Sequence, residues 1–217
     1  MALNLLIADD HPMFRAALLH ALAEPLRGGT AREAASHSAM EAVLAEGHPI
    51  DLVLLDLTMP GAMGFSSLLW LRGEHPDIPV LVVTSNDHPR NVRRAQQFGA
   101  AGFVSKSASA EALREAVAQV MAGGTAFTAA RAERSDEDAR LAARLSRLTP
   151  AQFRVLMLMA EGLLNKQIAA ELGLAENTVK IHVTAVLSKL ECRSRTQAAV
   201  LVKSLDVDEG VDGSHPG

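Results

Sequence analysis

Three carboxylates, a hydroxyl group and an ammonium group follow apolar segments of the sequence and could act together on phosphate. They belong to Asp9, Asp10, Asp56, Thr84 and Lys106. Three carboxylates brought close together repel one another unless a cation neutralises part of their charge. Mg²⁺ is the expected cation, because it prefers oxygen ligands and keeps waters that phosphate oxygens can replace.

These groups suit the transfer of a phosphoryl group to a carboxylate. Such a transfer depends mainly on positioning and on charge stabilisation, and a carboxylate can be the nucleophile that forms an aspartyl-phosphate. The metal would neutralise phosphoryl oxygens, Lys106 would pair with one of them, and Thr84 would donate a hydrogen bond to another. A single Asp after a strand is more often a helix N-cap, so the prediction depends on four strand ends carrying the required side chains together.

The segments that precede these residues predict a parallel β-sheet. Near-continuous apolar runs are typical of strands buried on both faces, and they occupy residues 3–8, 50–55, 80–83 and 102–104. A fifth strand is expected near residues 30–35, although β preference is low there. Apolar residues with helical spacing lie between the runs. We therefore predict a doubly wound α/β domain with a five-stranded parallel sheet, whose carboxyl strand ends form the ligand site.

The composition divides the chain into four parts. Residues 1–122 carry the sheet pattern, residues 123–147 are predicted to be a linker, and residues 148–205 form a small all-α domain. Residues 206–217 are acidic and contain several glycines, which is typical of a disordered tail. The linker contains Ser135-Asp136-Glu137-Asp138, which can begin a helix. The net charge of −4 conceals a basic segment, because the all-α domain carries seven Lys or Arg and four Asp or Glu.

Four short helices are expected in the all-α domain, at about residues 150–161, 166–172, 176–190 and 195–204. Thr149 is a good N-cap for the first helix, with Pro150 at N1 and Gln152 at N3 completing a capping box. Gly162 and Gly173 fall where helices should end. Two short helices joined by a tight turn that contains Gly are typical of a helix-turn-helix, so this basic domain predicts DNA binding.

The helix expected at residues 176–190 has two different faces. The inward apolar stripe consists of Val179, Val183, Val186, Leu187 and Leu190. The opposite face carries Asn177, Lys180, Ile181, Thr184 and Ser188. Such a face suits the major groove, where an exposed Ile can contact a thymine methyl group. Thr178, His182 and Lys189 flank it within reach of phosphates. On an arbitrary helix, these lysines would more often form a solvated surface.

The composition excludes several other classes of protein. The chain has 217 residues, of which 48% are hydrophobic and 21% charged, as in globular proteins. No apolar run reaches the ~20 residues of a bilayer-spanning helix, and the first residues lack the basic region of a signal peptide. A cytoplasmic protein with no membrane partner is therefore expected. The single cysteine, Cys192, excludes an internal disulfide and is expected to be a packing residue. The histidines show no metal-ligand spacing.

Four segments at the predicted strand ends carry a resemblance to a known family. They are Ile7-Ala8-Asp9-Asp10-His11, Leu55-Asp56-Leu57-Thr58-Met59-Pro60-Gly61 with Gly64, Val83-Thr84-Ser85, and Gly102-Phe103-Val104-Ser105-Lys106. Over about residues 3–122 the chain resembles the receiver domain of bacterial two-component response regulators. The resemblance implies a flavodoxin-like fold and phosphorylation of Asp56 by a sensor histidine kinase.

The same resemblance implies roles for other residues. Asp10 and Asp56, with the Thr58 carbonyl, would hold Mg²⁺, while Asp9 would act largely through water. Thr84 and Phe103 would form a switch pair that moves on phosphorylation, although Phe103 taken alone is a typical core residue. Met63 stands where the family usually has an acidic residue.

Residues 148–204 carry a second resemblance, in Leu148-Thr149-Pro150, Leu163-Leu164-Asn165-Lys166-Gln167-Ile168-Ala169, Asn177-Thr178-Val179-Lys180-Ile181-His182, and Lys189-Leu190 with Arg195-Thr196-Gln197-Ala198. They resemble the LuxR-type helix-turn-helix of the NarL/FixJ class. The resemblance implies contacts with double-stranded promoter DNA from Asn165, Lys166, Thr178, Lys180, Ile181, Thr184 and Lys189. Ala151-Gln152 replaces the usual Arg-Glu of the family. Basic residues also occur in the family at the Thr184 position, so no operator sequence follows.

Together the resemblances imply a DNA-binding response regulator and not an enzyme. Phosphorylation of Asp56 would shift a two-state receiver. An inactive receiver would mask the recognition helix or prevent pairing, and the active homodimer would bind a near-palindromic operator. RNA polymerase is a further candidate partner. The helix at residues 195–204, where Ala198, Leu201 and Val202 form one stripe, would either pair or belong to the core.

Two other functions remain open at this point. A ligand or a partner protein could control the receiver in place of phosphorylation, and unchanged promoter induction after Asp56→Ala would favour that function. A Mg²⁺-dependent phosphohydrolase could use Asp56 as its nucleophile and would turn over general phosphate esters. The phosphohydrolase leaves the all-α domain unexplained.

Overall fold

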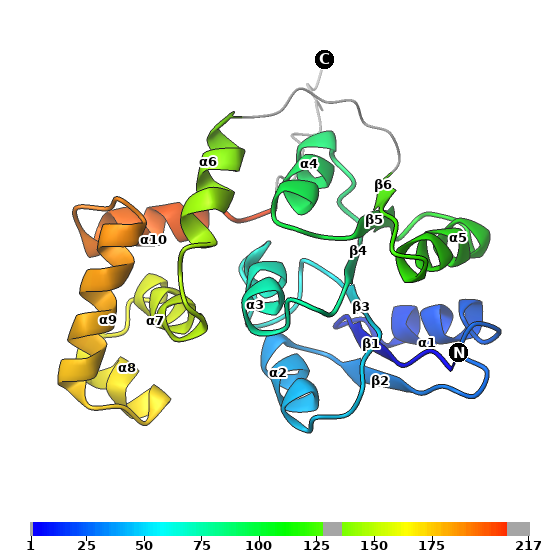
Figure 1. Ribbon diagram of the computed structural model, residues 1–217, viewed down its shortest axis with the longest axis horizontal. Coiled ribbons are helices and arrows are strands. Elements are labelled where there is room, and N and C mark those ends of the chain that lie inside the picture. The colour runs from blue at the N-terminus through cyan, green and yellow to red at the C-terminus, as the bar shows by residue number, and fades with distance from the viewer. Residues whose placement is uncertain (1, 128–135, 208–217) are drawn as a thin grey trace, which may run out of the picture.

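The computed structural model describes residues 2–127 and 136–207, which form a parallel α/β domain and a helical domain (Figure 1). The α/β domain contains a six-stranded parallel sheet in the order β2-β1-β3-β4-β5-β6. The strands are β1 Leu5–Ala8, β2 Ala31–Ala34, β3 Leu52–Leu55, β4 Val80–Thr84, β5 Gly102–Ser105 and β6 Ala126–Phe127. All five expected strands are present, and the doubly wound fold is confirmed.

The predicted number of strands is wrong, because β6 lies in the segment that was expected to be a linker. Gly102 of β5 pairs with Ala126, and Phe103 pairs with Phe127. A side chain on Gly102 would place its Cβ 2.7 Å from the Ala126 carbonyl oxygen. Glycine at this position therefore permits the close approach of β6. A strand of two residues is too short to produce an apolar pattern in the sequence.

Five helices cover the sheet in the described part of the α/β domain. They are α1 Pro12–Ala21, α2 His37–Ala45, α3 Ser66–Glu74, α4 Pro89–Gln97 and α5 Ala110–Met121. Helices α1 and α5 cover one face, and α2, α3 and α4 cover the other (Figure 1). Each face has its own apolar cluster, which buries the near-continuous apolar strands on both sides.

The helical domain consists of α7 Pro150–Ala160, α8 Asn165–Leu172, α9 Glu176–Lys189 and α10 Arg195–Lys203, close to the predicted bounds. The predicted capping box is present, since Thr149 Oγ1 accepts from the Gln152 amide and Gln152 Oε1 accepts from the Thr149 amide. Gly173 ends α8 with a φ of +63°. No helix among residues 2–127 and 136–207 is long and apolar enough to span a membrane.

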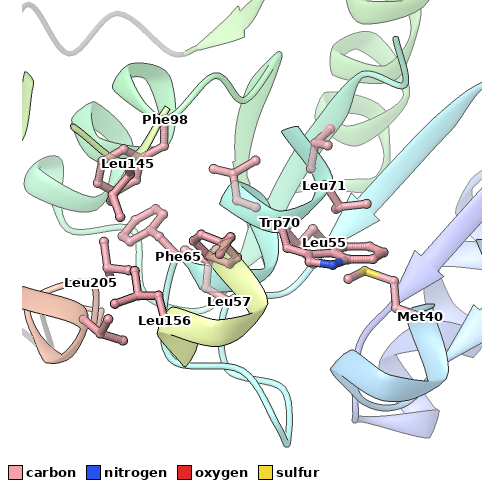
Figure 2. Close-up of a cluster of buried hydrophobic side chains, with 14 of the residues drawn as sticks. Met40, Leu55, Leu57, Phe65, Trp70, Leu71, Phe98, Leu145, Leu156 and Leu205 are labelled. Carbon is pink, nitrogen blue, oxygen red and sulfur yellow. The ribbon is translucent and has the colours of Figure 1, made fainter. Parts of the chain in front are cut away.

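Helix α6, Asp136–Leu145, lies between the two domains and begins at the position that the sequence predicted. The apolar cluster beneath α3 and α4 continues through α6 into α7 and α10, so the two domains share one core. Phe65, Leu145, Leu156 and Leu205 meet in it (Figure 2). Of the predicted disordered tail, Asp206 and Val207 are described, and the remainder lies outside the described residues.

Candidate functional site

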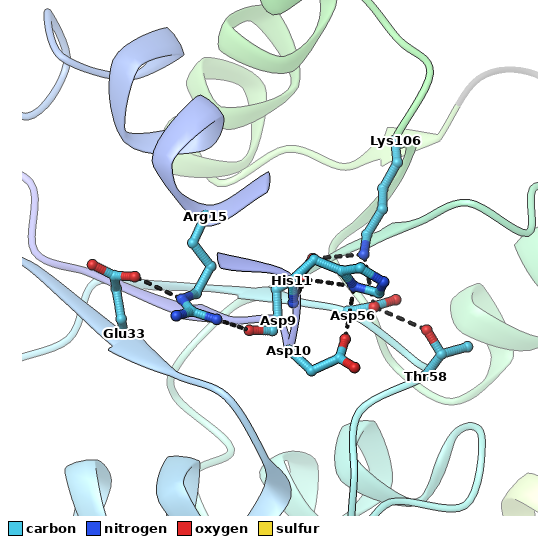
Figure 3. Close-up of polar contacts among 8 residues, drawn as sticks. All are labelled: Asp9, Asp10, His11, Arg15, Glu33, Asp56, Thr58 and Lys106. Atoms are coloured by element: carbon cyan, nitrogen blue, oxygen red, sulfur yellow. Dashed lines mark hydrogen bonds and ion pairs between the residues drawn. The ribbon is translucent and has the colours of Figure 1, made fainter. Parts of the chain in front are cut away.

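The carboxyl ends of β1 and β3 place Asp9 and Asp56 side by side. Ala8 pairs with Leu55 in the sheet, and the Asp56 amide donates a hydrogen bond to the Ala8 carbonyl at 2.8 Å. Asp9 and Asp56 are only 2% and 1% exposed. One ligand atom from each of Asp9, Asp10, His11 and Asp56 lies within 4.8 Å of the others. The predicted group of three carboxylates is therefore brought together (Figure 3).

Lys106 extends from the end of β5 and neutralises two of these carboxylates. Its Nζ lies 2.8 Å from Asp56 Oδ2 and 2.7 Å from Asp9 Oδ2. Burial alone would lower the pKa of Lys106, but the hydrogen bonds and negative charges of Asp56 and Asp9 outweigh it and raise this pKa above its ordinary value. The ammonium group also lies 4.8 Å from the centre of the Phe14 ring, a cation–π contact that sequence reasoning missed.

Other polar groups fix the cluster in place (Figure 3). The Thr58 hydroxyl donates to Asp56 Oδ2 at 2.9 Å, although the resemblance implied a role only for its carbonyl. His11 Nδ1 lies 2.8 Å from Asp10 Oδ1, so this histidine belongs to the cluster and was missed. Arg15 donates to the Asp9 carbonyl at 2.7 Å and pairs with Glu33. In the sequence, only the position of His11 directly after Asp9-Asp10 could have indicated that this histidine belongs to the cluster.

The donor set fits a hard divalent cation. Asp56 Oδ2 accepts from Lys106 and Thr58, whereas Asp56 Oδ1 is buried and has no hydrogen-bond partner within the described part of the chain. A buried carboxylate oxygen without a partner is costly, and additional positive charge within the cluster would reduce that cost. The carboxylates of Asp9, Asp10 and Asp56 supply the oxygen ligands that Mg²⁺ prefers.

Thr84 and Phe103 lie on the neighbouring strands β4 and β5 and are both buried. The Thr84 hydroxyl oxygen accepts a long hydrogen bond of 3.4 Å from the Asn86 amide. Among the described residues it makes no hydrogen bond to the carboxylates or to Lys106. Phe103 packs in the apolar cluster beneath α3 and α4. Their role as a switch pair therefore stays a prediction.

The helical domain presents the outward face of α9 to solvent. The polar residues predicted for that face are exposed, and Ile181 is 63% exposed. Lys180 pairs with Glu176 at 3.1 Å, and the Thr184 hydroxyl donates to the Lys180 carbonyl. Thr178 lies half-buried beside them. An exposed Ile between polar side chains is the arrangement expected of a base-reading face.

The remaining predicted DNA contacts differ in their surroundings. Lys166 is exposed at the start of α8, and Asn165 accepts a hydrogen bond of 3.1 Å from Arg195 of α10. Lys189 is half-buried and donates to the Arg147 carbonyl and to Gln152 Oε1, both at 2.7 Å. This ammonium group therefore ties the end of α9 to the start of α7, a structural role that sequence reasoning missed.

The structure also bears on two alternatives that the sequence left open: whether the α/β domain covers α9, and whether α10 is a pairing surface or part of the core. Helix α7 lies between α9 and the α/β domain (Figure 1), so the α/β domain does not cover α9 in this arrangement. Ala198 and Val202 are fully buried against α7, which places that part of the α10 stripe in the core of the domain. Cys192 is half-buried, and burial raises the pKa of its thiol, as suits the expected packing residue.

Comparison with known proteins links both halves of the chain to described families. The model described as "Response regulator receiver domain" matches residues 5–118, and "Bacterial regulatory proteins, luxR family" matches residues 146–202. The glycerol metabolism activator of Pseudomonas putida is 36% identical over 212 residues, covering 94% of this chain and 96% of that protein. The nitrate/nitrite response regulator NarL of Escherichia coli K12 is 35% identical over 210 residues, covering 92% and 94%.

Solved structures share the fold. RcsB of Salmonella enterica serovar Typhimurium bound to the promoter rprA has a TM-score of 0.54 and 23% identity, covering 94% of this chain and 99% of that chain. A sheet with a carboxylate cluster at its edge, joined to a helix-turn-helix, defines a two-domain signalling regulator of transcription. The chain belongs to the DNA-binding response regulators of the NarL/FixJ class, which join a receiver to a LuxR-type domain. Members of this family are not enzymes, which excludes the phosphohydrolase.

Proposed function

We propose that Asp56 accepts a phosphoryl group from a sensor histidine kinase and thereby controls transcription. The observation that carries the proposal is that the two carboxylate oxygens of Asp56 have different surroundings. Oδ2 is anchored by Lys106 and Thr58, whereas Oδ1 has no hydrogen-bond partner among the described residues. One oxygen is thus positioned while the other remains for attack at phosphorus, as a carboxylate nucleophile requires.

Asp10 and Asp56, with the Thr58 carbonyl, would hold Mg²⁺, and Asp9 would act largely through water. When bound, the ion supplies charge neutralisation at the phosphoryl oxygens. Lys106 would pair with one of these oxygens, which its place between Asp9 and Asp56 supports. Thr84 would donate to another after a small movement and, with Phe103, would carry the change away from the site.

The helical domain would bind double-stranded promoter DNA through α8 and α9, using Asn165, Lys166, Thr178, Lys180, Ile181, Thr184 and Lys189. A solved structure holds two RcsB dimers on DNA, and we expect the active form of this protein to bind a near-palindromic operator as a homodimer. RNA polymerase is a candidate partner at the promoter. Binding to promoter DNA also implies a cytoplasmic location.

The proposed domain limits follow the sequence pattern. Residues 1–122 form the receiver and residues 148–205 the DNA-binding domain. Residues 123–147 connect them and include α6, and the strand β6 at the start of this segment joins the receiver sheet. Residues 206–217 would be the acidic tail, whose first residue accepts a hydrogen bond from α4 through its carbonyl.

The experiment is a measurement of DNA affinity at fixed salt, because phosphate contacts make affinity strongly salt-dependent. The probe is a duplex selected from a random-sequence pool by wild-type protein treated with a small-molecule phosphodonor and Mg²⁺. We expect the phosphodonor to tighten binding by wild type and by the control Asp77→Asn, an exposed carboxylate, but not by Asp56→Ala. Equal binding in all conditions would leave DNA binding intact and favour control by a ligand or a partner.

A further inference from the structure

Arg94 is a buried arginine at the junction of the two domains. It lies on α4, is 2% exposed, and its guanidinium carbon is 5.0 Å and 5.4 Å from the ring centres of Phe65 and Phe98. A guanidinium group is rarely buried unless its donors have partners. The partners of Arg94 therefore reveal what its position serves.

Those partners come from both segments that flank the DNA-binding helices. Nη1 donates to the Asp206 carbonyl at 2.9 Å, and Nη2 donates to the Ser204 carbonyl. Nε lies 3.4 Å from Asp138 Oδ1 on α6. Ser204 is the C-cap of α10, so a positive charge here also complements the negative end of the helix dipole. One side chain of the receiver thus holds both α6 and the end of α10.

The loop that follows Asp56 approaches the same segment. The Phe65 amide donates to the Leu205 carbonyl at 3.0 Å, and Leu205 is fully buried beside Phe65 (Figure 2). A Cβ atom on Gly64 would lie 2.2 Å from the Leu205 carbonyl oxygen. The loop of residues 57–65 therefore contacts Asp56 at one end, through Thr58, and the DNA-binding domain at the other.

Helix α6 extends the connection to the recognition helix. Asp138 faces Arg94 near the start of α6, and Arg144 near its end donates to the Leu190 carbonyl at 3.3 Å. Leu190 is the C-cap of α9. The contacts of Arg94 therefore reach, through one rigid helix, the end of the helix predicted to read DNA.

We propose that Arg94 is an interdomain latch that holds residues 204–206 and α6 against the receiver, and that release of this latch frees the DNA-binding domain. A domain held to its own receiver cannot reorient to match the second half-site of a two-fold operator. The loop of residues 57–65 connects the phosphorylation site to the latch, because it contacts Asp56 through Thr58 and Leu205 through Phe65. This regulatory part depends on the proposed phosphorylation of Asp56, whereas the latch itself does not.

The test measures amide hydrogen exchange at Phe65 in the full chain without phosphodonor, because this amide bonds across the domain junction. In Arg94→Met, which keeps the apolar stem, we expect Phe65 exchange to rise at least about tenfold. The control Arg93→Ala removes a neighbouring arginine that has no hydrogen bond or ion pair among the described residues, and it should leave exchange unchanged. Wild-type exchange in Arg94→Met, with the variant folded, would overturn the latch.

A second variant reaches the same contact from the opposite side. Gly64→Ala should displace the Leu205 carbonyl and give the same fast exchange at Phe65. The Asp56 amide, which bonds inside the sheet, reports whether the receiver is still folded in either variant. If the Asp56 amide stays protected in Gly64→Ala and the Phe65 amide stays protected as well, the latch is likewise contradicted.

DNA affinity for the selected duplex tests the regulatory part. If at most about a tenth of the latched protein is competent to bind DNA, unphosphorylated Arg94→Met should bind at least about tenfold more tightly than wild type. The gain should persist in Arg94→Met with Asp56→Asn. Fast exchange without tighter binding would overturn regulation through the latch. A third outcome separates the two proposals. If Arg94→Met shows fast Phe65 exchange and tight DNA binding, but the phosphodonor changes neither quantity in wild type, the result counts against phosphorylation of Asp56 and not against the latch.

Discussion

The Nζ atom of Lys106 lies 2.8 Å from Oδ2 of Asp56, and 2.7 Å from Oδ2 of Asp9, so one ammonium group serves two buried carboxylates. The pair comes from the ends of two strands that are not neighbours in the sheet, because β4 lies between β3 and β5. The site therefore depends on the long lysine side chain to cross β4.

Replacing Lys106 with Met should destabilise the protein when no divalent cation is present. Two buried carboxylates would lose their counter-charge, and breaking such a pair costs about 3–5 kcal/mol when it is fully buried. Urea unfolding should reveal the loss, and millimolar Mg²⁺ should reduce it. Lys166→Met, at an exposed lysine, is the control. Equal loss with and without Mg²⁺ would contradict a cation site among these carboxylates.

Lys180→Ala should weaken DNA binding at all sequences to a similar degree. Lys180 is exposed on α9 and paired only with Glu176 in the described structure. If it contacts a phosphate, its removal lowers the slope of log affinity against log salt by about 1. Titrations at several salt concentrations measure the slope, with Lys203→Ala on α10 as control. An unchanged slope would exclude the phosphate contact.

Lys189→Met should lower the stability of the helical domain. Lys189 donates two hydrogen bonds of 2.7 Å within the protein, and hydrogen bonds to charged groups contribute about 1.5–3 kcal/mol each in favourable cases. Because this side chain is partly solvated, a total loss of about 1–2 kcal/mol in urea unfolding is expected. Wild-type stability together with weaker DNA binding would show that Lys189 acts as a phosphate contact alone.

His37 should make the domain junction sensitive to acid. Its Nδ1 lies 2.9 Å from Ser67 Oγ, and Glu41 lies between His37 and Arg154 of α7. Burial lowers the pKa of His37, Glu41 opposes this shift, and Arg154 adds to it. The folded state thus disfavours the charged imidazole.

The stability that depends on neutral His37 is fully present above the unfolded pKa of about 6.5 and is lost as pH falls from there towards the lowered folded pKa. Urea unfolding at about pH 7.5 and about pH 5.5 measures the loss. His37→Gln, which keeps a hydrogen-bonding side chain, should lose less stability on acidification than wild type. Identical losses in both proteins would assign the acid sensitivity to other groups.

Local patterns allowed most of the receiver and the recognition helix to be predicted. Apolar runs identified four strands, a fifth was expected near residues 30–35 despite low β preference, and the common edge of the sheet brought Asp9, Asp56 and Lys106 together. Contacts between distant segments were not accessible. Arg94 belongs to a strongly polar helix that reads as a solvated surface, yet tertiary packing buries it. Lys189 read as a phosphate contact, because nothing in the sequence brings Arg147 and Gln152 to it.

The apolar core that the two domains share makes separation of the domains costly, because separation exposes buried side chains. Opening the junction would bring Phe65, Leu145, Phe153 and Leu205 into water, and each Å² of apolar surface exposed costs roughly 25 cal/mol. If two open copies cover these surfaces against one another, part of that free energy is recovered. Opening and the proposed dimerisation would then be linked, and the fraction of open protein would rise with the total protein concentration in the cell.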